Sequence, residues 1–110
     1  AIEQIEGVKT KRIVFEKAKR KETLVLRSAE DAGDSFDDKA LATLKEQVDF
    51  KRQFVLLFAW RGSGQDQLKF DIAESFPEQI HFSLRPGRTR DLRPHVKIFA
   101  LRNNVKWSVK

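Results

Sequence analysis

The chain has 110 residues, of which 40% are hydrophobic, a net charge of +6 and no cysteine. This length supports one domain with a modest core, and we expect that domain to span residues 1–110 with a flexible start over residues 1–7. The lack of cysteine excludes a disulfide framework, a thiolate zinc site and a cysteine nucleophile. No apolar run approaches the roughly 20 residues of a membrane-spanning helix, so no transmembrane segment is expected. Because the chain begins at Ala1 and not at a methionine, one interpretation is that an upstream segment has been removed.

The charged residues are unevenly distributed along the chain. Residues 9–21 hold seven lysines and arginines and one glutamate, residues 28–50 hold seven acids and two lysines, and residues 85–97 hold five lysines and arginines. Two basic segments therefore flank an acidic one. A basic surface favours polyanions such as nucleic acid, a membrane surface or acidic polysaccharide. The alternative is a solvated surface whose charges partly neutralise one another.

The first part of the chain has patterns that are typical of strands. Residues 8–17 alternate, with Ile13 and Phe15 on one face, and we expect them to form a strand at the edge of a sheet. A basic connector follows at residues 18–21. Residues 22–27 then predict a second strand, because they are rich in residues that favour extended backbone.

The pattern changes to that of helices at Ser28. Ser28 and Asp31 resemble a capping box, which predicts that a short helix begins there. Asp37 or Asp38 can cap a second helix over residues 39–47, where leucines recur at helical spacing. The acidic residues of this segment therefore suit helix N-termini, where negative charge is favourable.

The same acidic residues raise the alternative of a calcium site. An EF-hand loop needs a glycine at its sixth position and a glutamate at its twelfth. Counted from Asp31, these positions hold Phe36 and Ala42. We therefore favour helix capping over calcium binding.

The chain is organised around the apolar run at residues 54–60. This run is too short for a membrane span, and it is followed by the turn-forming sequence R-G-S-G. Such a run is typical of a strand that is buried on both faces. We expect it to be the central strand, with residues 62–66 as a tight polar hairpin loop.

Four more strands are predicted in the second half of the chain, at residues 67–73, 79–84, 96–101 and 105–109. In the first two of these, the apolar residues Leu68, Phe70, Ile72, Ile80, Phe82 and Leu84 are expected to face inward and His81 outward. Pro77 marks one turn, and Asn103 with Asn104 suits a tight hairpin turn. Trp60 and Trp107 are expected to pack in the core, the alternative being exposed platforms on which bases stack.

The order of predicted elements is β-β-α-β-β-β-β-β. Five consecutive strands after one helical segment imply a mostly antiparallel sheet with a short helical insert packed on one face, which is an α+β fold. The alternative is a β-sandwich in which the helices are small additions to the surface.

The most unusual stretch is residues 85–95, which read R-P-G-R-T-R-D-L-R-P-H. Prolines and a glycine make the loop stiff, and arginine forks match carboxylates and phosphates. The functional interpretation is an anion-binding loop. The structural alternative is an internal ion-pair network, in which Asp91 holds Arg88, Arg90 or Arg93 and other arginines pair with Asp66 or the acidic helical segment.

Motifs for catalysis fail on inspection. Residues 62–66 lack the spacing of a nucleophile elbow and the lysine of a phosphate-binding P-loop. A triad of Ser63, His95 and Asp91 can be written, but nearly any chain allows one. His81 and His95 have no neighbouring ligands at metal-site spacing. We therefore expect no catalytic residue, no metal site and no cofactor.

The strings V-D-F-K-R-Q-F-V-L-L-F-A-W-R-G-S-G-Q-D and R-P-G-R-T-R-D-L-R-P-H-V, with the closing hairpin, resemble a group of small, uncharacterised exported bacterial proteins. The order of elements over residues 22–109 is also loosely similar to the C-terminal domain family of PrcB-type protease-complex subunits. That family has a T-G-G-Y-type loop where residues 62–65 read G-S-G-Q. The resemblance implies an extracytoplasmic domain without enzymatic activity.

Together these observations predict a non-enzymatic interaction domain that works outside the cytoplasm and binds another protein. The alternative is binding of a polyanion, either nucleic acid or acidic polysaccharide, through the basic loop. The expected binding residues lie at the end of the central strand and in the two loops: Arg61, Ser63, Gln65, Asp66, Arg85, Arg88, Arg90, Arg93 and His95.

Overall fold

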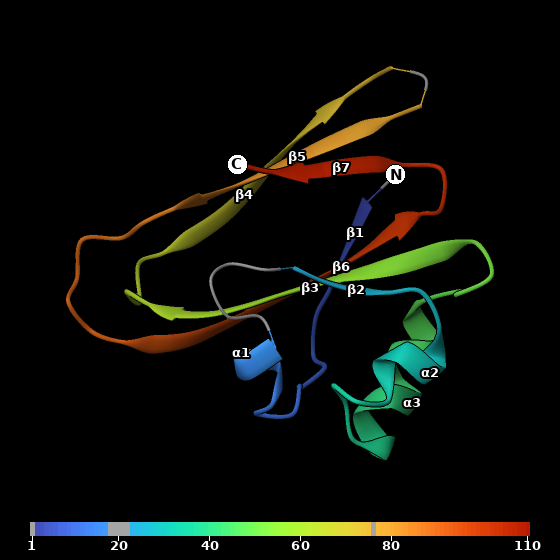
Figure 1. The fold of residues 1–110 in the computed structure, drawn as a ribbon, viewed down its shortest axis with the longest axis horizontal. Coiled ribbons are helices and arrows are strands. Elements are labelled where there is room, and N and C mark those ends of the chain that lie inside the picture. Colours follow the sequence, from blue (N-terminus) through green and yellow to red (C-terminus); the bar gives the residue numbers. More distant parts are fainter. Residues whose placement is uncertain (1, 18–22, 76) are drawn as a thin grey trace.

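The computed structural model of the chain describes residues 2–17, 23–75 and 77–110 (Figure 1). In this part of the chain the strands are β1 (Ile2–Ile5), β2 (Leu24–Leu26), β3 (Gln53–Gly62), β4 (Gln67–Ala73), β5 (Gln79–Arg85), β6 (Arg93–Arg102) and β7 (Lys106–Val109). The helices are α1 (Val14–Lys17), α2 (Ala29–Ala32) and α3 (Asp38–Gln47). The predicted connector at residues 18–21 and the first residue of the second predicted strand lie outside the described residues.

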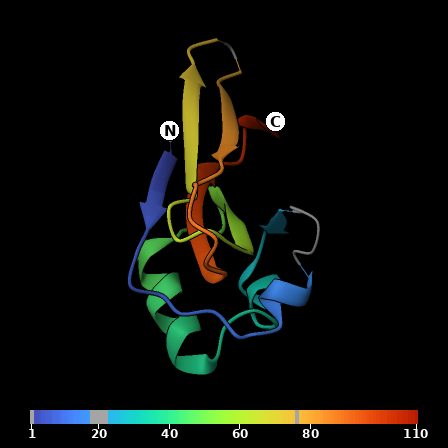
Figure 2. The ribbon, with the colours of Figure 1, turned by 90° about the vertical axis from the view of Figure 1, so that its left-hand side faces the viewer.

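The strands form two sheets, and their pairing is mostly antiparallel, as predicted. One sheet has the order β1-β6-β3-β2 with every pair antiparallel, and the other has the order β4-β5-β7. Strands β4 and β5 form an antiparallel hairpin, while β5 and β7 run parallel. Figure 2 shows the helices at one end of the molecule and the β4–β5 hairpin at the opposite end.

Strand β3 is buried on both faces, which confirms the prediction of a central strand. It lies between β6 and β2. Val55 and Leu57 point to a cluster that also contains helical residues, and Leu56 and Phe58 point to a second cluster that contains β5 residues. Alternate side chains of β3 therefore pack on one face against the helical layer, which is formed by α2, α3 and the residues between them, and on the other face against the second sheet.

The helical layer forms where the capping residues predict it. The Ser28 hydroxyl accepts a hydrogen bond from the Asp31 amide at 3.1 Å. The Asp37 carboxylate accepts one from the Ala40 amide at 2.7 Å, so Asp37 is the cap of α3. Leu44 of α3 is fully buried in the first cluster. Each cap satisfies a backbone donor that the first helical turn leaves unpaired.

The first strand was predicted at the wrong place in the chain. The first strand lies at residues 2–5, where a flexible start was expected, and it pairs with β6. Residues 8–17 form no strand, and their last four residues form α1. The reason is burial: Ile5 and Val14 enter the core, whereas Ile13 is 44% exposed, so the alternation around Ile13 does not mark a sheet face. Gly7, with a positive φ of 77°, turns the chain after β1.

Two predicted hairpins are connections between sheets. Residues 62–66 join β3 to β4, and residues 103–104 join β6 to β7, but neither pair of strands is hydrogen bonded. The turn residues mark correctly where the chain changes direction. They cannot specify the partner, because β3 pairs with β6 and β7 pairs with β5 across long sequence separations. The turn at Pro77 does join a true hairpin.

The inward face of the second sheet is only partly covered. Ile80 and Phe82 of β5 are fully buried, as predicted. Phe70 and Ile72 of β4 lie beside them in register but are 37% and 44% exposed. The prediction that they would be buried was therefore wrong, because β4 is the edge strand of a hairpin that projects from the body of the molecule (Figures 1 and 2).

One end of the first sheet narrows to a ribbon of two strands. β3 and β6 pair over ten residues each, but β2 pairs with β3 only at residues 55–57 and β1 pairs with β6 only at residues 98–101. Residues 58–62 and 93–97 therefore extend past both outer strands. This ribbon carries the loops after β3 and before β6 away from the helical layer (Figure 1).

Candidate functional site

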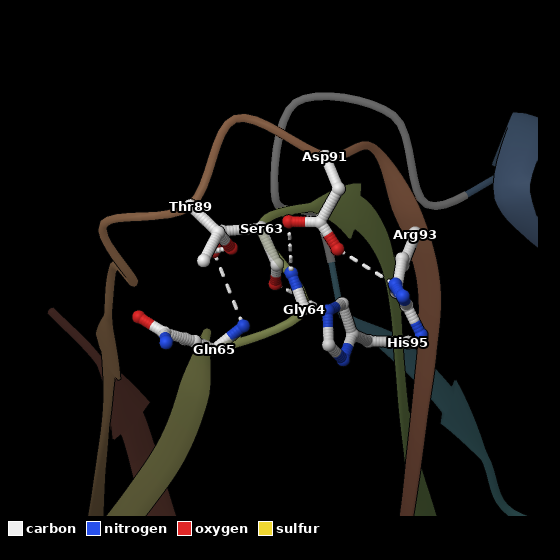
Figure 3. Close-up of polar contacts among 7 residues, drawn as sticks. All are labelled: Ser63, Gly64, Gln65, Thr89, Asp91, Arg93 and His95. Atoms are coloured by element: carbon white, nitrogen blue, oxygen red, sulfur yellow. Dashed lines mark hydrogen bonds and ion pairs between the residues drawn. The ribbon is translucent and has the colours of Figure 1, made fainter.

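The two loops that the sequence singles out lie against each other. We call residues 62–66 the glycine loop and residues 85–95 the arginine loop. Hydrogen bonds join them at several points, and the close-up in Figure 3 shows side chains of both loops pointing toward one another. The sequence did not indicate whether the loops meet, and together they form what we call the two-loop site.

Asp66 is the main link between the loops. One carboxylate oxygen accepts a hydrogen bond from the Gly87 amide at 2.7 Å, and the other accepts one from the Trp60 indole at 3.1 Å. The backbones approach so closely that a Cβ on Gly87 would lie 2.5 Å from the Cβ of Gln65. Only glycine fits this position without a shift of its neighbours.

A second group of contacts uses short polar side chains. The Ser63 hydroxyl bonds to the Thr89 hydroxyl and accepts a hydrogen bond from the Gln65 amide at 3.1 Å. The Gln65 side-chain oxygen accepts a long hydrogen bond, 3.4 Å, from the Arg88 amide. These contacts fix the backbone of the arginine loop and leave the Arg88 guanidinium group unused.

Asp91 holds the tip of the glycine loop. Its carboxylate accepts hydrogen bonds from the Gly64 amide at 3.1 Å and from the Arg93 guanidinium at 2.6 Å. The pKa of Asp91 is lowered to about 2 by the Thr89 hydroxyl, then by the Gly64 amide and the Arg93 guanidinium, which all favour the carboxylate. Of the ion pairs considered for Asp91, the structure contains the one with Arg93.

His95 closes the base of the site. Its ring stacks on the Trp60 indole with centroids 4.8 Å apart, and its Nε2–H donates to the Ser63 carbonyl oxygen at 2.7 Å. The Ser63 hydroxyl bonds to Thr89 and not to His95, and Asp91 bonds to Gly64 and Arg93. Although the three residues of the hypothetical triad lie close together, their contacts are not those of a nucleophile, base and orienting acid.

The remaining arginines of the site are available. Arg85, Arg88 and Arg90 are exposed, and among the described residues none of their guanidinium groups has an ion pair or a hydrogen bond. The Arg61 guanidinium lies over the Phe15 ring, 5.4 Å from its centroid. The two acids of the loops are occupied elsewhere, so the internal ion-pair network proposed for these arginines is reduced to the Asp91–Arg93 pair.

The predicted site residues therefore fall into two groups. The polar groups of Ser63, Gln65, Asp66, Arg93 and His95 build the site by bonding within it. The guanidinium groups of Arg61, Arg85, Arg88 and Arg90 are not engaged by any acid among the described residues. The first group supplies rigidity and the second supplies positive charge.

Sequence reasoning missed three residues of the site. Leu92 is 71% exposed in the middle of the arginine loop, where a solitary leucine in a polar, proline-containing stretch was the available signal. Thr89 had no recognisable pattern, because its role depends on Ser63 across the loops. Trp60 was expected in the core and does pack against the second core cluster, half-buried, but its stacking with the His95 ring was not anticipated.

Another polar pair lies on the open face of the second sheet. His81 Nδ1 is 2.7 Å from the Ser108 hydroxyl, across the parallel β5–β7 pair. Asp71 is the cross-strand neighbour of His81 on β4. This arrangement is a cross-strand hydrogen bond on a solvated sheet face.

The pocket beside the two-loop site is small. An apolar pocket beside Trp60, lined also by Phe58, Leu68 and Leu84, has a volume of about 40 Å³. Sites for small ligands usually enclose about 300–1,000 Å³.

In the described ranges, no three histidines, cysteines or acids are grouped as metal ligands would be. Among the helices of the same ranges, none has the length and apolar character of a membrane span.

Comparison of the chain with protein-family models, with curated proteins and with solved structures finds no match. The similarity to exported bacterial proteins and to the PrcB C-terminal domain family therefore stays an expectation from the sequence. The function must be argued from the site itself.

Proposed function

We propose that this protein is a non-enzymatic interaction domain whose two-loop site binds an acidic segment of another protein. The observation that carries the proposal is the exposure of Leu92, 71%, in a loop whose Arg88 and Arg90 have no acidic partner in the part of the chain that the structure describes. An exposed apolar side chain with unpaired arginines in the same loop fits an apolar residue flanked by acids. Buried apolar and arginine contacts supply much of the energy in protein interfaces.

Three features of the loop support a preorganised binding surface. Its backbone is held at Gly87 by Asp66 and at Arg88 by Gln65. Asp91 fixes the loop at its other end through Gly64. A loop that is ordered before binding loses less conformational entropy in the complex, so its contacts contribute more to affinity.

The exposed leucine also favours a protein over a polyanion. Nucleic acids and acidic polysaccharides are bound mainly through charge, and their affinity falls steeply with salt. Leu92 would contribute little to such a contact. A partner that combines acidic and apolar side chains uses both Leu92 and the free arginines, and part of its affinity persists at near-physiological salt.

The geometry supports binding more than catalysis. The hydroxyl, imidazole and carboxylate groups of the site bond to one another or to backbone, and the adjacent pocket of about 40 Å³ is too small to enclose a substrate. Catalysis needs a nucleophile or base aimed at such a space. Here the polar groups maintain loop structure.

Selection of short displayed peptides against the immobilised domain tests this function. We expect the selected peptides to place Asp or Glu on both sides of an apolar residue and to bind saturably at near-physiological salt. The variants Arg88→Ala/Arg90→Ala and Leu92→Ala should each weaken binding about tenfold, because arginine and apolar anchors contribute about 1–2 kcal/mol or more. Since these side chains have no partners within the described residues, melting temperatures should not change.

A matched control is Arg52→Ala, which removes a positive charge that lies in a different hollow, beside Asp49 and Arg102. Its affinity for the selected peptides should equal that of the unaltered domain. The proposal fails if peptides bind the Leu92 and arginine variants as well as the parent. Tight binding of heparin or DNA that depends on the arginines and not on Leu92 would establish the polyanion alternative instead.

Action outside the cytoplasm is also part of the proposal, and its support is the resemblance to exported bacterial proteins. Fractionation of the cells that make the protein tests it. Recovery in the periplasm or medium is expected, and recovery in the cytoplasm would contradict it.

We further propose to class the fold as α+β and not as a β-sandwich with added helices. Support comes from Ala32, Phe36 and Leu44, helical-layer residues that are fully or almost fully buried in the first core cluster. Helices that were additions to the surface would contribute little to a core.

A further inference from the structure

Strand β4 has a free edge, and along it apolar side chains alternate with one lysine and one aspartate. β4 is the outer strand of the second sheet, and among the described residues only β5 pairs with it. Its hairpin projects from the body of the molecule (Figure 2). An edge of this kind presents unpaired backbone donors and acceptors that a further strand can bind.

The side chains of β4 differ between its two faces. Leu68, Phe70 and Ile72 lie on the inner face, and Phe70 and Ile72 remain 37% and 44% exposed. Lys69 and Asp71 lie exposed on the outer face, and in the part of the chain that the structure describes neither has an ion pair. Both faces therefore have side chains that a neighbouring strand would cover or neutralise.

We infer that β4 pairs antiparallel with β4 of a second copy, which joins two second sheets into one of six strands in a twofold-symmetric dimer. The register is centred on Phe70. Lys69 of each copy then lies opposite Asp71 of the other, and Leu68 lies opposite Ile72 of the other. Opposite charges at directly facing positions stabilise strand pairs, and aromatic residues do so as well.

This register is specified by the sequence of the strand. A shift by one residue places charged side chains opposite apolar ones on the same face. A shift by two residues in either direction places Lys69 opposite Lys69 or Asp71 opposite Asp71, and like charges at facing positions are destabilising. The centred register is therefore the one in which both faces match.

On the inner face of β4, the partly exposed Phe70 belongs to an aromatic cluster. Phe70 contacts Phe82 and Phe99, with ring centroids 5.9 and 5.6 Å away, so the aromatic cluster of the core reaches the sheet edge. In the dimer the two Phe70 rings meet across the twofold axis and continue this cluster. Strand addition of this kind takes its affinity from backbone hydrogen bonds and its specificity from alternate side chains.

The same lysine that permits self-pairing opposes other strands. Lysines on edge strands normally discourage edge-to-edge pairing. A strand without an acid opposite Lys69 would leave that charge without a partner. β4 is therefore selective for a second copy of itself.

Sedimentation equilibrium of the 110-residue chain over a range of concentrations tests the inference. The strand is seven residues long, and its interface is small, so we expect a reversible monomer–dimer equilibrium of moderate affinity. Asp71→Lys alone, or Lys69→Asp alone, creates two like-charge contacts in each dimer and should weaken dimerisation at least about tenfold. The double variant Lys69→Asp/Asp71→Lys restores both opposite-charge contacts and should restore dimerisation.

Thermal melting of dilute samples is the folding control. Both side chains are exposed, and within residues 2–17, 23–75 and 77–110 neither has an ion pair or a side-chain hydrogen bond, so each variant should melt as the parent protein does. A parent protein that stays monomeric at all concentrations overturns the inference. A dimer that the single variants leave intact, or that the double variant fails to restore, overturns the pairing of β4 as well.

Discussion

At the scale of the residue, Asp91 links the loops through its ionised form. Its pKa is lowered to about 2 from 3.8 by the Thr89 hydroxyl, the Gly64 amide and the Arg93 guanidinium. A lowered pKa means that the folded state binds fewer protons than the unfolded state between these values. The stabilisation is therefore fully present above about pH 4 and is lost as the pH falls toward 2.

Asp91→Asn should show this dependence directly. Above about pH 4 the variant should melt at a lower temperature than the parent protein, because the amide cannot replace both charge-assisted contacts. The difference between the two melting temperatures should shrink as the pH is lowered from 4 to 2. A constant difference over this range would show that ionisation of Asp91 does not matter.

Gly87 tests how tightly the loops are packed. A Cβ there would lie 2.5 Å from the Gln65 Cβ and 2.6 Å from its carbonyl carbon, so Gly87→Ala should destabilise the fold by about 1–3 kcal/mol. The comparison variant is Gly64→Ala, whose Cβ would meet side-chain atoms of Asp91 and Arg93 and not backbone. Chemical denaturation should give the smaller loss for Gly64→Ala, and equal losses would contradict the close backbone approach at Gly87.

At the scale of the element, α3 is an integral part of the core. Leu44 is fully buried in the cluster beneath the first sheet, so Leu44→Ala should lower the free energy of unfolding by about 2–5 kcal/mol. Leu41→Ala, at a partly buried position of the same helix, is the control and should lose less. A negligible loss for Leu44→Ala in chemical denaturation would favour helices that only decorate two sheets.

The elements that the sequence predicted correctly are those with a local physical signal. An unbroken apolar run predicted β3, and capping residues such as Ser28 and Asp37 predicted the helix starts. The first strand was misplaced because residues 8–17 alternate better than residues 2–5, which read I-E-Q-I. Burial of Ile5 and Val14 depends on the rest of the fold, which a local pattern does not contain.

Which strands pair with each other could not be predicted from local sequence patterns. Turn residues at 62–66 and 103–104 indicated reversals, but each connection passes from one sheet to the other. The composition of the site was predicted more fully than its contacts. The arginines, glycines and acids of the site were identified from the sequence. Which arginines would be left without an acidic partner could not be predicted, because Asp66 and Asp91 each have several possible donors and the fold determines which ones they bind.

At the scale of the whole molecule, the two proposed interaction surfaces use different groups, although they adjoin where the glycine loop runs into β4 and the arginine loop leaves β5. The two-loop site lies at the end of the β3–β6 ribbon, whereas the free edge of β4 belongs to the projecting hairpin (Figure 1). A dimer formed through β4 would carry two copies of the two-loop site. Such a dimer would bind a partner with repeated acidic segments more tightly than a monomer, because the second contact is intramolecular.

In the proposed function, the two loops act as one binding surface for an acidic, partly apolar segment. The most direct measurement is an NMR titration of the isotope-labelled domain with a short peptide in which glutamates flank a leucine, at near-physiological salt. We expect saturable amide shifts confined to residues 62–66 and 85–95, and we expect Leu92→Ala to reduce them. Shifts spread over the basic surface, or shifts that heparin produces equally well without Leu92, would contradict it.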